Sequence, residues 1–406
     1  MLCQFTVKNF RCIRDELTLD MQAASITEHE SSLLVEKDGA QFLPVAVLYG
    51  PNGGGKSTVF MAISALIHKV MRPIVVALNE NANNELGPTL SIEPFLFDSK
   101  SITQPTEFEI FFRTDTVEYR YQLHVFKEKI EFESLHRKTI EGGRYSEVFT
   151  RKGSTIISMK GALRRYNASG ITETLPLLSF LGITHKENPL IKDVINWFEN
   201  EIVVVNYGHP VVESLIYLPE AKEEKELLLN MLKEIDIDIT GFHKNSLSED
   251  EFEIYATHCI EGKSYELELS QESSGTIKLF GVLPRIMDCI QEGGTLIMDE
   301  LDAKLHPALL KHIISLFINP TINKKKSQLL FTSHDLSTMT NELFRRDEIW
   351  FVAKDKYQSS HMYSLVEFKN DNGKITRKDA AYGKQYLEGR YGADPYLKRI
   401  ISWEEN

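Results

Sequence analysis

The chain has 406 residues, of which 42% are hydrophobic, so it can hold one large domain or two to three ordinary ones with a substantial core. Asp and Glu number 58 against 46 Lys and Arg, and the formal net charge of -12 argues against indiscriminate binding to nucleic acid or anionic membranes. The 4 cysteines are scattered without a C-x-x-C pair, which indicates neither a disulfide framework nor a zinc site, and no segment approaches the roughly 20 apolar residues of a membrane span. We therefore expect a soluble, cytoplasmic protein whose cysteines are free thiols.

The N-terminal part of the chain predicts a hairpin, followed by a strand, a loop and a helix. Residues 1–20 alternate between apolar and polar side chains, which is typical of a β-hairpin. Residues 45–49 form a short, apolar, β-branched run that predicts a strand, and residues 58–70 carry apolar side chains at helical spacing. The polar stretch NENANNELGP at 79–88 indicates a loop.

The middle of the chain changes from a strand pattern to a helical one. Residues 108–137 alternate with period two, interrupted at Thr114-Asp115 and Lys127-Glu128, which predicts an inserted meander of antiparallel strands. Residues 177–233 are mostly helical in pattern, broken by the apolar run IVVV at 202–205. A second alternating pair of strands follows at 252–269, and strand–helix alternation then resumes. We expect an N-terminal part of an ATPase core at 1–90, a β-subdomain with a helical insert at 91–265, and the C-terminal part of the core at 266–406.

The loop between the strand at 45–49 and the following helix matches a phosphate-binding motif. Its eight residues from Gly50 to Ser57 fit G-x-x-x-x-G-K-[ST], in which backbone N–H groups surround phosphate oxygens. The positive end of the helix would face the same anion, with Lys56 bridging the terminal phosphates and Ser57 reaching Mg²⁺. The motif in this context predicts a nucleotide-binding loop of Gly50, Pro51, Asn52, Gly53, Gly54, Gly55, Lys56, Ser57 and Thr58.

Two later strands end in residues suited to nucleotide hydrolysis. The apolar run GTLIM ends in Asp299, which suits an outer-sphere Mg²⁺ contact, and Glu300, which could orient or deprotonate the attacking water. The apolar run QLLFT ends in Ser-His-Asp at 333–335, and because consecutive residues point in different directions these cannot form a hydrolase triad among themselves. His334 is instead placed to contact a γ-phosphate. Acids at a strand end, or a single histidine, would be ordinary features in isolation, and their order after the phosphate loop makes them candidates.

In this order, the motifs resemble those of the ABC-type ATPases, and within them the SMC-like branch. GPNGGGKST resembles Walker A, LIMDELD resembles Walker B with its catalytic glutamate and following D-loop, and TSHD resembles the switch-histidine motif. The family's signature lies at a helix N-terminus shortly before Walker B, where LSQESSGTIKLF places its core at Ser274 and Gly275. That stretch departs from LSGGQ, and SIEPFLFDS at 91–99, in the place of the Q-loop, contains no glutamine. The implied fold is α/β, an ABC-type (SMC-like) P-loop ATPase with an antiparallel β-subdomain and a mainly helical insert.

The stretches FTVKNFRCIRDELTLDM, DELDAKLHP, SSGT and YLEGRYGADP resemble a narrower group, the RloA/AbiL-type AAA family ATPases of prokaryotic defence islands, related to the Septu, PARIS and OLD ATPases. This resemblance implies that Asn9 and Arg11 lie near the nucleotide and that Asp302 lies at the interface between two ATPase domains. It also implies an ATP-dependent homodimer, in which Walker A of one subunit and the signature of the other hold one ATP. Such a protein would be the sensor or regulatory ATPase of an anti-phage system that controls a separate effector.

The sequence also bears on other activities and partners. After His334, VEFKNDNGK at 366–374 predicts a strand and a turn rather than a paired-carboxylate metal site, so a nuclease activity would belong to a separate effector protein. A locally basic region could bind DNA, RNA or an acidic partner, or could be an ordinary solvated hairpin face. It consists of His136, Arg137, Lys138, Arg144, Arg151, Lys152, Lys160, Arg164 and Arg165.

Two alternative functions and one alternative nucleotide are less well supported by the sequence. A DNA-repair or chromosome-maintenance clamp is disfavoured because no heptad pattern persists long enough for an extended coiled coil. A transporter ATPase subunit would need a membrane partner, and DELD in place of DEP, the degenerate signature and the large insert count against it. GTP is disfavoured as the nucleotide because no N-K-x-D segment follows a strand, and Ala353-Lys354-Asp355 is a poor substitute.

Overall fold

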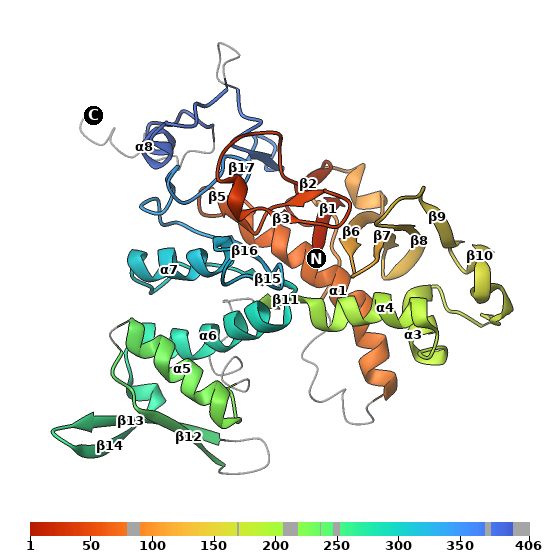
Figure 1. The fold of residues 1–406 in the computed structure, drawn as a ribbon. Coiled ribbons are helices and arrows are strands. Elements are labelled where there is room, and N and C mark those ends of the chain that lie inside the picture. The colour runs from red at the N-terminus through yellow and green to blue at the C-terminus, as the bar shows by residue number, and fades with distance from the viewer. Residues whose placement is uncertain are drawn as a thin grey trace.

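A computed structural model describes residues 1–78, 90–168, 170–205, 218–235, 237–246, 252–369 and 375–392 of the protein (Figure 1). The loop predicted at 79–88 lies outside the described residues, as do parts of the stretches at 366–374 and at the C-terminal YLEGRYGADP. The described chain forms a parallel core sheet, a larger antiparallel sheet beside it, and a small three-stranded sheet at the lower left of the view.

The core sheet has six strands, and all neighbouring pairs are parallel except the last. Its spatial order is β11 (Ile202–Val205), β15 (Thr295–Met298), β16 (Gln328–Thr332), β5 (Val45–Tyr49), β17 (Ile349–Lys354) and β18 (Ser360–Ser364). Every residue of β5 is buried, as expected for a parallel strand covered on both faces. The strands predicted at 45–49 and 328–332 are confirmed.

Helices cover the two faces of the core sheet and define two hydrophobic cores. Alternate residues of β5 face opposite sides, so that Ala46 and Leu48 join one core while Val45 and Val47 join the other. The first core contains α1 (Lys56–Leu78), α3 (Leu177–Thr184) and α4 (Pro189–Asn196). The second contains α5 (Lys222–Glu234), α6 (Ser274–Glu292), α7 (Pro307–Ile318) and α8 (Tyr382–Leu387). Short helical turns occur at Glu30–Ser32, Ser101–Thr103, Gly161–Arg165, Trp197–Glu201 and Leu269–Gln271.

The antiparallel sheet has seven strands and contains the predicted hairpin and meander. Its order is β10 (Thr155–Met159), β9 (Ser146–Lys152), β8 (Lys129–Thr139), β7 (Val117–Phe126), β6 (Thr106–Arg113), β1 (Leu2–Lys8) and β2 (Leu17–Asp20). Lys127 and Glu128, where the alternation is interrupted, both have positive φ and form the tight turn between β7 and β8. Because β1 pairs with β6, this sheet crosses the boundary that we predicted at residue 90.

Two further sheets complete the described fold. β12 (Gly241–Ser246), β13 (Phe252–Ile260) and β14 (Lys263–Glu268) form an antiparallel sheet, and the pair predicted at 252–269 is β13 with β14. β3 (Leu34–Val35) pairs with β4 (Gln41–Phe42). The run at 202–205, which we assigned to the insert, is instead the core strand β11, paired with β15 across some ninety residues of sequence.

The expectation that no segment is apolar enough to span a membrane is wrong for α1. By length and composition this helix could cross a membrane, and it is the one such helix in the described part of the chain. However, 50% of its apolar window is buried inside the protein, where Phe60, Ile63 and Leu66 have no exposed surface. The helix follows directly from the phosphate loop and runs through the first core, which accounts for its apolar composition.

Candidate nucleotide site

The phosphate loop between β5 and α1 is held against the backbone of β17, and this contact requires glycine. Gly50 has φ 155°, and a Cβ added to it would lie 2.0 Å from the Val352 carbonyl oxygen. A Cβ on Gly54 would lie 2.9 Å from the same oxygen, and one on Gly55 would lie 2.3 Å from the Ser360 hydroxyl. The bare backbone of the motif therefore serves close packing at three positions, which leaves the loop N–H groups in a fixed arrangement.

Lys56 lies across this loop in a position suited to a phosphate group. Its side chain is 6% exposed, and Nζ donates hydrogen bonds to the carbonyl oxygens of Gly50 at 2.8 Å and Pro51 at 3.2 Å. Burial lowers the pKa of Lys56, while the carboxylates of Asp299, Glu300 and Asp302 act to raise it. A negatively charged ligand in the loop would complete the neutralisation of this ammonium group.

Many of the predicted residues line one hollow of about 330 Å³, whereas Gly50, Asp299 and Asp302 do not line it. Its lining includes the whole loop from Pro51 to Thr58 together with Glu300 and His334. Glu300 follows the end of β15, and His334 follows the end of β16, much later in the sequence. Sequence reasoning did not assign Cys12 or Lys354, which also line it. Lys354 ends β17 beside the loop, and Cys12 Sγ donates a hydrogen bond to Thr58 Oγ1 at 3.2 Å. With Arg11, Lys56 and Lys354 against one carboxylate, the hollow is suited to a polyanion.

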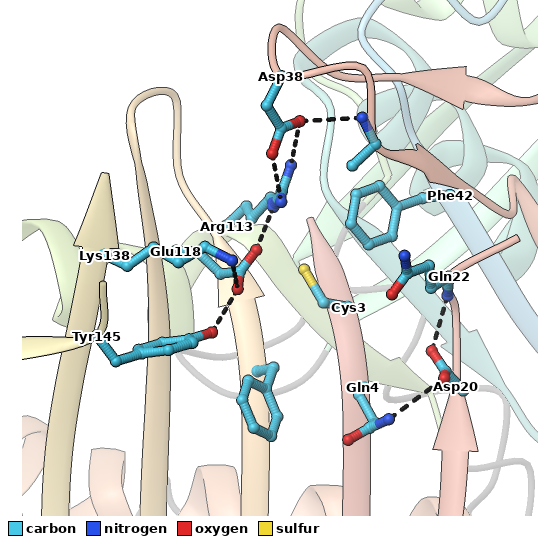
Figure 2. A pocket seen from close by; sticks show the side chains of 12 residues that line it. Cys3, Gln4, Asp20, Gln22, Asp38, Phe42, Arg113, Glu118, Lys138 and Tyr145 are labelled. Atoms are coloured by element: carbon cyan, nitrogen blue, oxygen red, sulfur yellow. Dashed lines mark hydrogen bonds and ion pairs between the residues drawn. The ribbon is translucent and has the colours of Figure 1, made fainter. Parts of the chain in front are cut away.

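A second hollow, of about 400 Å³, lies at the edge of the seven-stranded sheet and differs in its charges (Figure 2). Arg113 there bonds both oxygens of Asp38 and also Glu118, which in turn accepts from Lys138 and Tyr145. Because each cation already faces a carboxylate, this hollow offers no unneutralised positive charge to a phosphate. The size of a hollow is thus a poorer guide to the nucleotide site than its charge.

The acids after β15 are held by a residue that sequence reasoning missed, Thr332 at the end of β16. Its hydroxyl accepts a hydrogen bond from the Glu300 N–H at 2.7 Å and donates one to Asp299 Oδ1 at 2.6 Å. Glu300 has φ 49°, a left-handed backbone conformation that residues other than glycine rarely adopt. The threonine therefore fixes both the carboxylate assigned to Mg²⁺ and the strained turn that carries the carboxylate assigned to water.

His334 and Asp302 are brought together by a backbone contact. The His334 N–H donates to Asp302 Oδ2 at 2.9 Å, while Oδ1 of the same carboxylate is buried without a hydrogen-bond partner among the described residues. Burial, followed by the charge of Lys56, lowers the pKa of His334, so that its imidazole is neutral at pH 7. The Asp302 carboxylate therefore holds the backbone of His334, the residue predicted to contact a γ-phosphate.

A helix begins at the place predicted for the signature, since α6 starts at Ser274. Ser273 is its N-cap and accepts a hydrogen bond from the Thr276 N–H at 3.1 Å. Ser274 is exposed, and neither it nor Gly275 lines the hollow described above. The first turn of α6 is therefore not part of the hollow at the phosphate loop of the same chain.

Asn9 and Arg11, which were expected near the nucleotide, behave differently. Arg11 lines the hollow, and its Nε is buried without a hydrogen-bond partner in the described part of the chain. Asn9 does not line it and is 2% exposed. Its Nδ2 donates to the carbonyl oxygens of Ser101, Gln104 and Pro105, and its Oδ1 accepts from the Phe95 N–H at 3.0 Å. The assignment of Asn9 to nucleotide contact is therefore corrected, because its polar atoms are all engaged in holding the 95–105 segment.

The residues assigned to Mg²⁺, Ser57 and Asp299, come from α1 and from the turn after β15. No group of three or more His, Cys, Asp or Glu side chains that could hold a metal occurs among the described residues. Mg²⁺ prefers oxygen ligands and usually keeps substrate phosphates and waters in its coordination shell. A hydroxyl and a carboxylate beside a phosphate loop fit that mode of binding, in which the metal arrives with the nucleotide.

Not every residue of the predicted basic region is free to bind a ligand. Arg151 is fully buried and lies 3.7 Å from the buried Glu133, and it donates to three backbone carbonyl groups. Lys138 pairs with Glu118. Arg137, Arg144, Lys152, Lys160, Arg164 and Arg165 are exposed.

The chain is similar to several solved structures, and it matches one family model. A comparison with curated protein sequences gave no match. Among solved structures, the chain is similar to the SMC head domain from Thermotoga maritima, with 13% identity over 89% of this chain and 98% of that one, at a TM-score of 0.38. It is also similar to an SmcHead bound to the C-winged helix domain of ScpA, with 13% identity over 89% and 97% of the two chains, at a TM-score of 0.43. These scores carry no argument beyond the topology already described.

The family comparison is more extensive. The model described as "AAA domain, putative AbiEii toxin, Type IV TA system" matches residues 45–180 and 195–340. These ranges include the phosphate loop, the start of α6, the acids after β15 and the histidine after β16. The predicted fold class is confirmed, as is the nucleotide-binding type of the core. The chain therefore belongs to this AAA-domain family, which supports ATPase activity.

Proposed function

We propose that the protein is a Mg²⁺-dependent ATP-hydrolysing switch of the cytoplasm, working as an ATP-dependent homodimer and regulating a separate effector in an anti-phage defence system. The observation that supports this most is the convergence of Lys56, Glu300 and His334 on one hollow at the phosphate loop. The stretches that resemble RloA/AbiL-type, Septu, PARIS and OLD ATPases support the role in defence. That part of the proposal rests on resemblance, since a fold by itself does not define a biological role.

The roles of the residues follow from their positions. The loop N–H groups and Lys56 bind the β- and γ-phosphates, and bound Mg²⁺ would neutralise charge on the same phosphates. Glu300 lines the hollow opposite the loop and acts on the attacking water, as an orienting group or a base. His334, neutral at pH 7 because burial lowers its pKa, can donate one hydrogen bond to a γ-phosphate oxygen from an uncharged ring.

Dimerisation would complete the site. The exposed first turn of α6, with Ser274 and Gly275, offers N–H groups to an anion held by another subunit. One ATP would then join two subunits, and hydrolysis would release them. The reaction would thus set how long the dimer persists and regulates its effector, rather than serve metabolism. We expect no nuclease activity in this chain.

The test is ATP hydrolysis and oligomeric state of the purified protein. Lys56→Ala should abolish nucleotide binding, because it removes the buried ammonium group of the loop. Glu300→Gln should bind ATP but hydrolyse it at least about 100-fold more slowly, and should accumulate as dimer or higher oligomer. Glu342→Gln, an exposed acid beyond the switch histidine, is the matched control and should behave as the wild type. Normal hydrolysis by Glu300→Gln would show that the catalytic assignment is wrong.

The same assay separates the alternatives when duplex DNA is added. Strong stimulation by DNA would favour a clamp-like or DNA-sensing role and would direct attention to exposed basic residues such as Arg137 and Arg144. A rate indifferent to DNA would favour control by a protein partner, which should then co-purify from cells. A requirement for a membrane protein would instead favour the transporter alternative.

A further inference from the structure

Lys278 of the signature helix is buried against the turn that carries the catalytic residues. Its side chain is 2% exposed, and Nζ donates hydrogen bonds to the carbonyl oxygens of Glu300 at 2.8 Å, Leu301 at 2.8 Å and Ala303 at 2.6 Å. An ammonium group has three N–H bonds, and this turn supplies an acceptor for each of them. Lysine is rarely buried so fully unless its charge is compensated, so this position has a specific purpose.

The carbonyl groups that Lys278 binds belong to the turn between Walker B and α7. Within this turn the Ala303 N–H donates to the Glu300 oxygen at 3.1 Å, and Glu300 itself has the left-handed φ of 49°. Three carbonyl dipoles directed to one point repel one another, and a cation between them removes that repulsion. Lys278 thus stabilises a backbone conformation that would otherwise be unfavourable.

Burial and the nearby carboxylates act in opposite directions on the pKa of Lys278, and burial has the larger effect. Burial lowers the pKa of Lys278 to about 8, whereas the carboxylates of Asp302 and Glu300 act to raise it and Lys304 acts to lower it. The ammonium group is therefore mostly retained at pH 7, where it can hold all three carbonyl groups.

The other end of the connection is the first turn of α6. Lys278 lies four residues after Ser274 and three after Gly275, so these residues share one face of the helix. A Cβ added to Gly275 would lie 3.0 Å from the Lys304 carbonyl oxygen. The same turn therefore also packs closely against the first turn of α6. From this turn the connection continues to His334, whose N–H is held by Asp302 at 2.9 Å.

We propose that Lys278 is a positioning residue that couples the signature helix to the catalytic turn of its own subunit. Contact of Ser274 and Gly275 with a nucleotide on a second subunit would be transmitted through Lys278 to Glu300, Asp302 and His334. The two ATP sites of a dimer would then hydrolyse in a concerted manner. The catalytic part of this inference rests on the proposed function, whereas the positioning part does not.

Kinetics test the catalytic part in the full-length protein. Lys278→Met removes the donors at similar length, and we expect kcat to fall at least about tenfold while ATP affinity, measured by titration with Mg²⁺ and ATP, stays within about threefold. The Hill coefficient of hydrolysis should also fall toward one. Lys278→Arg, which retains a charged donor, should recover a substantial part of kcat, and Lys311→Met, an exposed lysine on α7, should match the wild type. Unchanged kcat in Lys278→Met, or a loss of affinity equal to the loss of kcat, would overturn the coupling.

Amide hydrogen exchange without nucleotide tests the positioning part separately. Exchange in the peptide 299–306 should be faster in Lys278→Met than in the wild type, and near the wild-type rate in Lys278→Arg. Equal protection in all three proteins would refute the positioning role even if ATP hydrolysis is normal. Faster exchange together with a wild-type protein that hydrolyses no ATP would instead uphold the positioning role and refute the proposed function. If Lys278→Met does not fold, Lys278→Gln, which removes the charge and shortens the side chain, must show the same changes.

Discussion

Replacement of Thr332 by valine tests the geometry of the catalytic turn most directly. Valine keeps the β-branched shape in the fully buried strand β16 but removes the hydroxyl. Two hydrogen bonds are lost, one from the Glu300 N–H at 2.7 Å and one to the Asp299 carboxylate at 2.6 Å. A hydrogen bond to a charged group contributes about 2 kcal/mol and one to a neutral N–H about 1 kcal/mol.

These magnitudes predict different effects on rate and on stability. The bond to Asp299 is already present in the resting structure, so its loss lowers stability. If its absence also leaves the carboxylates wrongly oriented in the transition state, a further cost of about 2 kcal/mol there lowers kcat about 30-fold, since each 1.36 kcal/mol is tenfold. The protein should still fold, with the free energy of unfolding lower by about 3 kcal/mol because both bonds are absent. Steady-state ATP hydrolysis measures the first effect and denaturant unfolding the second.

Thr332→Ser is the matched control for this experiment, because it keeps the hydroxyl and loses only a methyl group. It should retain most of kcat, although the small cavity will cost some stability. A Thr332→Val protein with wild-type kcat would refute the idea that the hydroxyl positions the two acids. A serine variant as slow as the valine variant would show that the methyl group, and hence packing of β16, is what matters.

Two other changes test the electrostatics and the loop. Burial raises the pKa of Glu348 to about 8, so its contribution to stability is complete below its ordinary pKa and is lost as pH rises toward 8. Glu348→Gln should therefore gain stability over the wild type as pH increases through this range, by up to about 5 kcal/mol. If the free energies of unfolding of the two proteins changed with pH in the same way, this reasoning would be contradicted. Gly50→Ala places a Cβ 2.0 Å from the Val352 carbonyl oxygen, so ATP binding should fall more than about tenfold in a direct titration. Gly39→Ala, where φ is 82° and no atom lies within 4 Å of the added Cβ, also places alanine at a positive φ but away from the site, and it should bind ATP normally.

The elements that could be predicted from the sequence are those whose pattern is local. The strand at 45–49, the glycine-rich loop and the start of α1 are contiguous, so period, β-branching and motif spacing together define a nucleotide site. The meander could be predicted because its turns interrupt a strict alternation at Lys127-Glu128. For the same reason the acids after β15 and the histidine after β16 could be recognised as strand-end residues.

The misplaced elements depend on partners far away in the chain. β11 has the apolar composition of any buried strand, and only its pairing with β15 makes it part of the core sheet. Asn9 belongs to a stretch that resembles a nucleotide-binding segment, yet its amide is engaged with three carbonyl groups near residues 101–105. Periodicity reports which face of an element is buried but not against what, so such assignments required the tertiary structure.

By itself, the sequence determined the class of the protein and the chemical groups of its site, because a phosphate loop needs glycines, a lysine and a hydroxyl at fixed spacing on one short segment. Tertiary structure decided how those groups are held. Thr332 reaches Asp299 and Lys278 reaches Glu300 only because parallel strands end at one edge of the sheet and α6 packs beside that edge. A threonine or lysine side chain has no local pattern that reveals such a partner, since hydrogen bonds across tens of residues are set by the packing of whole elements.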